Sequence, residues 1–379
     1  MKLLHIADLH LGKKLHGYDL LEDQKAALLE ILKIAEREKP NVCLIAGDVY
    51  QTSTPQGNAM ELMSDFLYRL SELGIEVFMI SGNHDSSQRI SYLSQLLKRA
   101  NVHVTDRFEG SLQTVMTEDE FGPVAIHLLP FIKPIEVRAQ LPGCTASTYE
   151  EAVRAVIEAS EIDPAIRNVL VCHQYVTGSE EGGSEERIVG GSEDITLAAL
   201  EAFDFVAMGH VHKPQTFRMA GGGLASYAGS LLPYAVSEGG YDKSCSLITL
   251  GAKGEEPKLD RILYPLLRKV RGVEESFERI MEMTPTEDLV AVTLTDSRIP
   301  AENYQSALRA IFPNLLSVGL KNQEIYETGP VDVSSVGKGR SDLELFEEFY
   351  EWSKKESLPE DEREIIIRLL NQSEGGTEE

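Results

Sequence analysis

The chain repeats one pattern that strongly constrains its fold: a short apolar run, a polar break, and a stretch with helical periodicity. The apolar runs occupy residues 2–7, 42–46, 76–80, 124–129, 168–172 and 205–208. Short runs without alternation are typical of strands that are buried on both faces. Between the first three runs, helical patterns cover residues 20–34 before Pro40 and 60–70 before Gly74. This order of strand, helix and strand predicts an α/β layered domain.

Polar signatures follow five of these runs, each at the point where a predicted strand ends. They are Asp8-Leu9-His10, Gly47-Asp48, Gly82-Asn83-His84-Asp85, Cys172-His173 and Gly209-His210-Val211-His212. Open α/β sheets usually bind their ligands at the carboxyl ends of the strands. A single histidine after a strand is more often a core or surface residue, but five signatures at strand ends favour one shared site.

The side chains of these signatures predict a site for two metal ions. Seven oxygen and nitrogen donors are present: Asp8, His10, Asp48, Asn83, His173, His210 and His212. The absence of thiolates from this set suits Mn²⁺ or Fe²⁺ rather than a structural zinc ion. Seven donors are too many for one ion that also keeps a position open for substrate. Two ions about 3.5–4 Å apart would use them all if one carboxylate bridges, and Asp48 is the best candidate.

The ordered set resembles the calcineurin-like metallophosphoesterase superfamily, whose pattern is D-x-H, G-D, G-N-H-D, a lone histidine, and G-H-x-H. This resemblance implies a four-layer β-sandwich flanked by helices. It implies that the first metal is held by Asp8, His10, Asp48 and His212, and the second by Asp48, Asn83, His173 and His210. It also implies that His84 contacts the phosphate and stabilises the transition state or protonates the leaving oxygen, with Asp85 orienting its ring.

A narrower resemblance comes from longer phrases around these signatures. The opening MKLLHIADLHLG, the phrases LIAGDVY and ISGNHDSSQRI, and the later GHVHKPQ and YAGSLLPYAVSE are similar to the SbcD family of nucleases. The strong resemblance covers residues 1–265, the predicted nuclease domain. One departure is Gln51, where related sequences often have aspartate, and it removes no expected ligand.

The SbcD resemblance implies a reaction and partners. The reaction is hydrolysis of phosphodiester bonds at double-stranded DNA ends, hairpins and single strands, by exonuclease and endonuclease activity in DNA repair, replication and recombination. The implied cofactors are two Mn²⁺ per chain, with Fe²⁺ or Mg²⁺ as substitutes. The implied partners are the SbcC ATPase and a second copy of the chain, giving a homodimer within a heterotetramer.

The rest of the chain is expected to divide into smaller parts. Residues 266–328 form a candidate α+β capping domain that seats DNA, with strands at 289–294 and 315–321 around a helix near 301–311. Residues 329–340 suggest a linker, and 373–379 a disordered tail. Between them, 341–372 is expected to form C-terminal helices for SbcC binding. Their apolar residues are Leu343, Phe346, Phe349, Tyr350, Trp352, Ile365, Ile366, Leu369 and Leu370. The alternative is that these helices fold back on their own chain.

Charge and cysteine content narrow the class of protein further. The formal net charge of −25 argues against a generic nucleic-acid binder, so bound cations or a partner subunit must attract DNA. The four cysteines contain no CxxC pair, which predicts free thiols. No apolar run approaches the roughly 20 residues of a membrane span, and no signal-peptide core precedes Asp8. We therefore expect a cytoplasmic protein without a membrane partner, associated with the nucleoid when it is bound to DNA.

Other candidate residues are given structural interpretations. His5 is expected to be packed within its strand, His16 to lie in a surface loop, and the thiol of Cys172 to point away from the metals. His103 and His127 are weaker candidates for the metal site than the signature histidines. The acidic loop 180–186 is expected to be a solvated segment. Two functions remain as alternatives: a small-molecule metallophosphoesterase that hydrolyses nucleotides or cyclic nucleotides, and a non-catalytic assembly subunit.

Overall fold

The structure is a computed structural model of the full chain. It describes residues 1–86, 94–185, 193–296 and 303–321, together with scattered positions between 343 and 367. Two compact units are present, one of residues 1–321 and one of residues 322–379.

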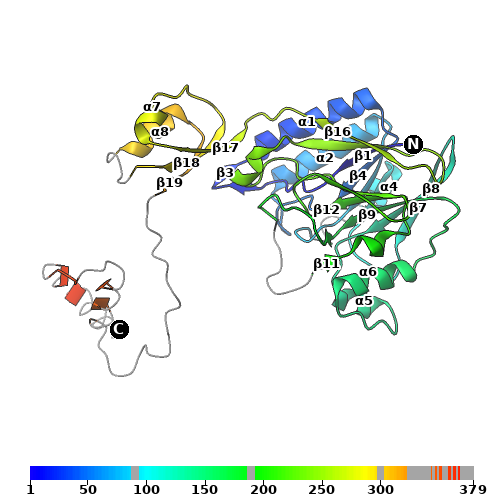
Figure 1. Cartoon of the computed structure of the whole chain (residues 1–379). Helices are drawn as coiled ribbons and strands as arrows, with labels where there is room; N and C mark the ends of the chain where they lie inside the picture. The colour runs from blue at the N-terminus through cyan, green and yellow to red at the C-terminus, as the bar shows by residue number, and fades with distance from the viewer. Residues whose placement is uncertain are drawn as a thin grey trace. The chain divides into compact units, whose positions relative to one another are not determined.

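The first unit is built on two six-stranded sheets (Figure 1). One sheet has the order β16-β15-β1-β4-β5-β6, and its members are β1 (Lys2–Ile6), β4 (Val42–Ala46), β5 (Glu76–Ile80), β6 (Val102–Thr105), β15 (Ser244–Thr249) and β16 (Lys258–Leu263). The strands β1, β4, β5 and β6 pair in parallel, and β15 and β16 are antiparallel additions at one edge. The predicted strands of the first three apolar runs therefore lie side by side.

The second sheet has the order β13-β14-β12-β9-β8-β7. Its members are β7 (Gln113–Asp119), β8 (Gly122–Leu129), β9 (Arg167–His173), β12 (Phe205–Gly209), β13 (Gln215–Arg218) and β14 (Leu224–Tyr227). The inner strands β8, β9, β12 and β14 are parallel, whereas β7 and β13 are antiparallel edges. The last three apolar runs form the centre of this sheet.

Three hydrophobic cores arrange these elements in four layers (Figure 1). The helices are α1 (Leu21–Glu38) and α2 (Gly57–Glu72), which cover the first sheet, and α5 (Pro134–Gln140) and α6 (Tyr149–Glu158), which cover the second. Side chains alternate between the cores along a strand: Leu4 and Ile6 pack toward the helices, whereas Leu3 packs between the sheets. Strands buried on both faces explain why the runs are apolar without alternation. The expected α/β class and the four layers are confirmed.

Helix boundaries follow from local chemistry. Along α2, Met63, Phe66, Leu67 and Leu70 recur at intervals of three or four residues and are all buried. Helix α1 ends at Glu38 because Pro40 follows, and Lys39 adopts a left-handed conformation (φ 52°) whose amide donates to the carbonyl of Ala35. Complete burial of one large apolar side chain contributes roughly 1.5–3 kcal/mol, so the packed faces hold these helices in place.

The remaining short elements connect the layers. They are β2 (Lys14–Leu15) paired with β3 (Tyr18–Asp19), β10 (Tyr175–Val176) paired with β11 (Asp194–Ile195), α4 (Ser94–Arg99), and the 3₁₀ helices η1 (Leu197–Leu200) and η2 (Val236–Gly240). The η2 turn lies after β14 and contains the buried residue Glu238. None of the helices among the described residues is long and apolar enough to cross a membrane.

A small sheet near the end of the first unit has its own core. It consists of β17 (Val270–Glu275), β18 (Leu289–Leu294) and β19 (Leu315–Leu320), with α7 (Phe277–Met281) and α8 (Tyr304–Ile311). Ile280, Val292, Leu308 and Phe312 are buried within it. The two strands and the helix expected here are present, but the parallel pairing of all three strands was not foreseen. Residues 301 and 302 of the expected helix lie outside the described residues.

The second unit is described at few positions. Leu343, Phe346, Tyr350 and Ile366 are helical. The other apolar residues expected there, Phe349, Trp352, Ile365, Leu369 and Leu370, lie outside the described residues, as do the linker 329–340 and the tail 373–379.

Candidate metal centre

The loops after β1 and β4 place their polar residues by adopting unusual backbone conformations. Asp8, His10 and Asp48 have φ values of 51°, 42° and 48°, in the left-handed region that non-glycine residues rarely adopt. Backbone hydrogen bonds hold the two loops together, since the Asp8 amide donates to the Gly47 carbonyl (3.1 Å) and the His10 amide to the Asp48 carbonyl (2.9 Å). Such conformations cost about 1–3 kcal/mol each and cluster at functional sites.

One group of donors gathers around His10. Its Nε2 lies 3.1 Å from Nε2 of His212 and 3.6 Å from Oδ2 of Asp48. Asp8, His10 and His212 also offer ligand atoms that all lie within 4.8 Å of one another. These three side chains are almost fully buried. The group is the one that the resemblance assigned to the first metal.

A second group gathers around His173. Its Nε2 lies 3.1 Å from Oδ1 of Asn83 and 3.4 Å from Oδ2 of Asp48, and Nδ1 of His210 lies 3.2 Å from the same Asn83 oxygen. Asp8, Asp48 and His173 again have ligand atoms within 4.8 Å of one another. Asp48 therefore belongs to both groups, as a bridging ligand must. All seven predicted donors meet at one place, where strands of both sheets have their carboxyl ends.

The chemistry of the donors fits cations at this site. Nε2 of His10 and Nε2 of His212 lie 3.1 Å apart, so one ring donates to the other when one of the two nitrogens is protonated. When neither is protonated, both present lone pairs that could hold a cation. Burial lowers the pKa of His10 well below its ordinary value and that of His210 to about 3, so both rings are neutral and able to bind a metal. The cluster thus fits a two-metal site.

The carboxylates of the centre have opposite pKa shifts. Burial would raise the pKa of Asp48, but the surrounding imidazoles, His173 first, outweigh burial and hold it well below the ordinary value. Burial raises the pKa of Asp8 to about 7, despite the opposing influence of His173 and His212. For His173, burial lowers the pKa, but Asp48 outweighs it and the pKa rises to about 9. Asp48 is therefore the carboxylate that favours its charged form in this buried site, and His173 is the ring that favours its charged form beside it.

Two glycines of the signatures leave room for these side chains. A Cβ atom on Gly82 would lie 2.1 Å from Oδ1 of Asp48, and one on Gly209 would lie 2.7 Å from Nδ1 of His173 and 1.9 Å from the Ala46 carbonyl oxygen. Real Cβ atoms do not approach other atoms so closely. The glycine that begins a signature is thus required by the close approach of a donor from another strand.

His84 lies at the edge of the centre. Its Nε2 is 3.9 Å from Oδ2 of Asp48, and its Nδ1 is 3.1 Å from the carbonyl oxygen of Gln51. The Asp85 carboxylate was expected to orient this ring; it accepts hydrogen bonds from the amides of Val49 (3.1 Å), Tyr50 (2.9 Å) and Gly82 (2.9 Å). The carbonyl of Gln51 therefore supports the His84 ring, and Asp85 holds the loop that carries Gln51.

Several supporting residues were missed by sequence reasoning. Gln24 of α1 donates to the His10 carbonyl (2.8 Å) and to the hydroxyl of Tyr234 (3.1 Å), which itself donates to the Leu9 carbonyl. Glu238 contacts Nδ1 of His212 at 3.2 Å and Nζ of Lys243 at 2.7 Å. Glu238 belongs to the phrase YAVSE, which marks the resemblance to the SbcD family. A charged residue directly after a largely apolar stretch is the sequence signal that points to Glu238.

The other histidines are packed in the core, paired with a polar side chain or exposed on the surface. His5 is buried with its ring nearly perpendicular to that of Phe205, and His16 is exposed. His103 lies 2.8 Å from a carboxylate oxygen of Glu76, and His127 lies 3.0 Å from the side-chain oxygen of Asn168. Cys172 packs in the core beneath the helices of the second sheet, whereas the adjacent His173 faces the metal centre, as alternation along a strand predicts.

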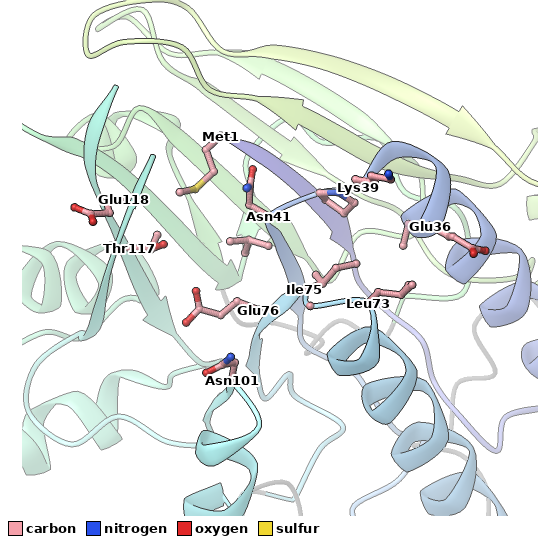
Figure 2. Close-up of a pocket in the computed structure, with 14 residues that line it drawn as sticks. Met1, Glu36, Lys39, Asn41, Leu73, Ile75, Glu76, Asn101, Thr117 and Glu118 are labelled. Carbon is pink, nitrogen blue, oxygen red and sulfur yellow. The ribbon is translucent and has the colours of Figure 1, made fainter. Parts of the chain in front are cut away.

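A separate surface cleft of about 780 Å³ lies at the opposite, amino-terminal ends of β4 and β5 (Figure 2). Glu36, Glu76 and Glu118 line it together with Lys39. Carboxylates repel phosphate groups, so this cleft is unsuited to an anionic phosphate ester. The metal centre is the better site for such a substrate.

Comparison with known proteins gives four similarities. The model of the calcineurin-like phosphoesterase family matches residues 1–214. The chain is 28% identical to the SbcD subunit of the SbcCD nuclease of Staphylococcus epidermidis over 381 residues, which cover 98% of each protein. Among solved structures, TT1561 of Thermus thermophilus is 15% identical with a TM-score of 0.42, covering 69% of this chain and 98% of that one. A dimetal phosphatase from Danio rerio is 11% identical with a TM-score of 0.39, covering 70% and 99%.

Proposed function

Because the chain belongs to the calcineurin-like phosphoesterase family, we propose that it is a two-metal nuclease that hydrolyses phosphodiester bonds in DNA. The observation that carries this proposal is the convergence of seven donors from five strand ends, with Asp48 shared between two groups. The similarity to the SbcD subunit of an SbcCD nuclease over nearly the whole of both chains supports DNA as the substrate class.

The donors divide between two cation positions. Asp8, His10 and His212 would hold the first ion, Asn83, His173 and His210 the second, and Asp48 would bridge them. When bound, the two ions would offset the charge of the phosphate and lower the pKa of a coordinated water from about 15.7 toward 7. We propose Mn²⁺ as the metal, with Fe²⁺ or Mg²⁺ as substitutes, since the donors are oxygen and imidazole nitrogen.

His84 acts on the phosphate from the side of the Gln51 loop. Because a carbonyl oxygen only accepts, the Gln51 carbonyl fixes a proton on Nδ1 of His84, and Nε2 is left to face the centre. To act as a general acid, His84 would carry a second proton, on Nε2, and would donate it to a phosphate oxygen or to the departing alkoxide. General-acid help of this kind contributes about 10²–10⁴ in rate. Asp85 would support the step by holding the backbone amides of Val49 and Tyr50 in place.

The parts outside the phosphoesterase core would serve DNA and partners. We propose that residues 266–328 act as a capping domain that seats DNA, that the helices in 341–372 dock on the SbcC ATPase, and that two copies of the chain pair. With a net charge of −25, the chain would depend on its metals and its partner to attract DNA. The same proposal includes exonuclease and endonuclease action in DNA repair, replication and recombination, in the cytoplasm.

The test is digestion of a linear duplex, a hairpin and a panel of phosphate monoesters by the full chain with Mn²⁺, with and without SbcC. We expect cleavage of the DNA substrates. Cleavage of monoesters alone would reject the nuclease and favour a small-molecule phosphoesterase, and no cleavage of either would favour an assembly subunit.

Two variants separate metal binding from chemistry. His84→Gln should keep two Mn²⁺ per chain and lose about 10²–10⁴ in rate, because only the proton donor is removed. Asp48→Ala should lose metal as well as hydrolysis, because both positions depend on this carboxylate. Full metal occupancy in Asp48→Ala, measured by elemental analysis after gel filtration, would contradict the bridging role.

A further inference from the structure

An ion pair with no solvent exposure lies directly behind the metal centre. The Glu238 carboxylate and the Lys243 ammonium group are both 0% exposed, and Oε2 lies 2.7 Å from Nζ. Removing two charges from water costs several kcal/mol per ion, and an apolar pair of similar size is often at least as stable. Stability alone therefore gives no reason for a chain to place this pair here, and its contacts suggest another.

Donors surround the Glu238 carboxylate on both oxygens. Oε2 accepts from Lys243, from the hydroxyl of Ser230 (3.1 Å) and from the amide of Tyr234 (3.3 Å). Lys243 also lies 2.8 Å from the Ser230 oxygen and 4.6 Å from the centre of the Tyr241 ring. These contacts fix the carboxylate in one position and balance its charge.

The other oxygen of Glu238 faces His212. Oε1 lies 3.2 Å from Nδ1 of His212 and also accepts from the hydroxyl of Ser184, whose oxygen lies 2.6 Å from the same ring nitrogen. A carboxylate only accepts, so Nδ1 of His212 must carry its proton. The lone pair is then on Nε2, the atom that faces His10 at 3.1 Å. The ring is held in the one tautomer that can bind a cation there.

The equivalent support of the second group is weaker. Nδ1 of His173 donates to the backbone carbonyl of Ala46 at 2.8 Å, a neutral acceptor. A carboxylate behind a ligating histidine makes that histidine more basic than a carbonyl does, and such partners are worth 10–100-fold in metal affinity. The two cation positions are therefore unequal in the strength of their donors.

We propose that Glu238, held by Lys243, is a positioning residue for His212 and makes the cation position that includes His212 the tighter of the two. This inference rests on the proposed two-metal centre and deepens it. It predicts that loading is sequential, with the position of Asp8, His10 and His212 filled first.

The test is calorimetric titration of the metal-free full chain with Mn²⁺. The wild type should bind two ions with separate affinities. The double variant Glu238→Gln, Lys243→Met removes both buried charges at nearly constant volume, and it should weaken the tighter site by about 10–100-fold while the other is unchanged. The matched control is Asp23→Asn, which neutralises another carboxylate with 3% exposure, paired with Arg268 at 2.9 Å, and should leave both affinities unchanged.

Each outcome decides the inference. A folded double variant with both affinities unchanged, or with both lowered equally, would overturn it. If that variant does not fold, Glu238→Asp keeps the charge pair but shortens the reach to His212 by one methylene, and it should produce the same selective loss. Absence of any Mn²⁺ binding by the wild type would instead reject the proposed two-metal function, so the two failures are distinct.

Discussion

Replacing Gly82 by alanine should weaken metal binding strongly without unfolding the protein. The new Cβ would lie 2.1 Å from Oδ1 and 2.4 Å from the backbone nitrogen of Asp48. Since non-bonded heavy atoms pack at about 3.5 Å, the Asp48 side chain would have to move by more than ~1 Å. Metal–ligand distances tolerate only about 0.2 Å, so a bridging carboxylate displaced this far cannot serve either position.

The cost to the fold should be smaller than the stability of the domain, so the variant should remain folded. Overpacking typically costs about 1–3 kcal/mol, whereas domains are stable by about 5–15 kcal/mol. We expect Mn²⁺ affinity to fall by at least ~10²-fold, which corresponds to about 2.7 kcal/mol. Titration calorimetry would measure the affinity, and circular dichroism with chelator present would measure the melting temperature.

A second glycine supplies the matched control. Gly57 is exposed in α2, and a Cβ there would meet nothing within 4 Å. Gly57→Ala should therefore bind metal as the wild type does and be slightly more stable, because alanine favours the helix. If Gly82→Ala binds two Mn²⁺ with unchanged affinity, the argument from close approach is refuted.

Two further predictions concern stability and assembly. The Arg167 guanidinium holds the pKa of Asp119 below its ordinary value, so this carboxylate contributes stability that is present at neutral pH and is lost as the pH falls below about 4. Asp119→Asn should lower the free energy of unfolding at pH 7 by about 1.5–3 kcal/mol and make its decline in acid shallower, as measured by urea unfolding; an unchanged acid profile would contradict this. Truncation after Arg340 should leave Mn²⁺-dependent DNA cleavage intact but weaken association with SbcC, which co-purification would test, and an undiminished yield of complex would exclude docking through residues 341–372.

Much of the site could be predicted because its donors occur at the ends of apolar runs. Asp8, Asp48 and His173 each come at the end of a strand buried on both faces, and such strands leave a clear mark in the sequence. The seven donors then meet because parallel strands end at the same edge of a sheet. The identity of the donors follows from this local rule without knowledge of the pairing.

The division of the strands between two sheets could not be predicted in the same way. Strands β14, β15 and β16 were not expected, because Leu224–Tyr227 is short and Lys258–Leu263 mixes polar and apolar residues without strict alternation. The pairing of β1 with β15 joins residues more than 200 positions apart, which no local periodicity reveals. Strand order depends on packing across the whole chain.

The contacts that support the metal centre also could not be predicted from local sequence patterns. Asp85 acts on the amides of Val49 and Tyr50, and Glu238 acts on His212, each through a loop that is distant in the sequence. The same residue types on a surface would merely be solvated. Their roles depend on burial, and burial is decided only when both sheets have packed.

The donors of the metal centre come from both sheets. Asp8, His10, Asp48 and Asn83 follow strands of one sheet, whereas His173 ends a strand of the other and His210 and His212 follow its neighbour. A loaded cation pair would therefore act as a cross-link between two layers that are otherwise joined mainly by apolar packing. Heat resistance becomes linked to metal supply, since each tenfold rise in free ion above the dissociation constant adds about 1.4 kcal/mol to the folded state. When the metal is scarce, the protein would lose activity and would also become easier to unfold.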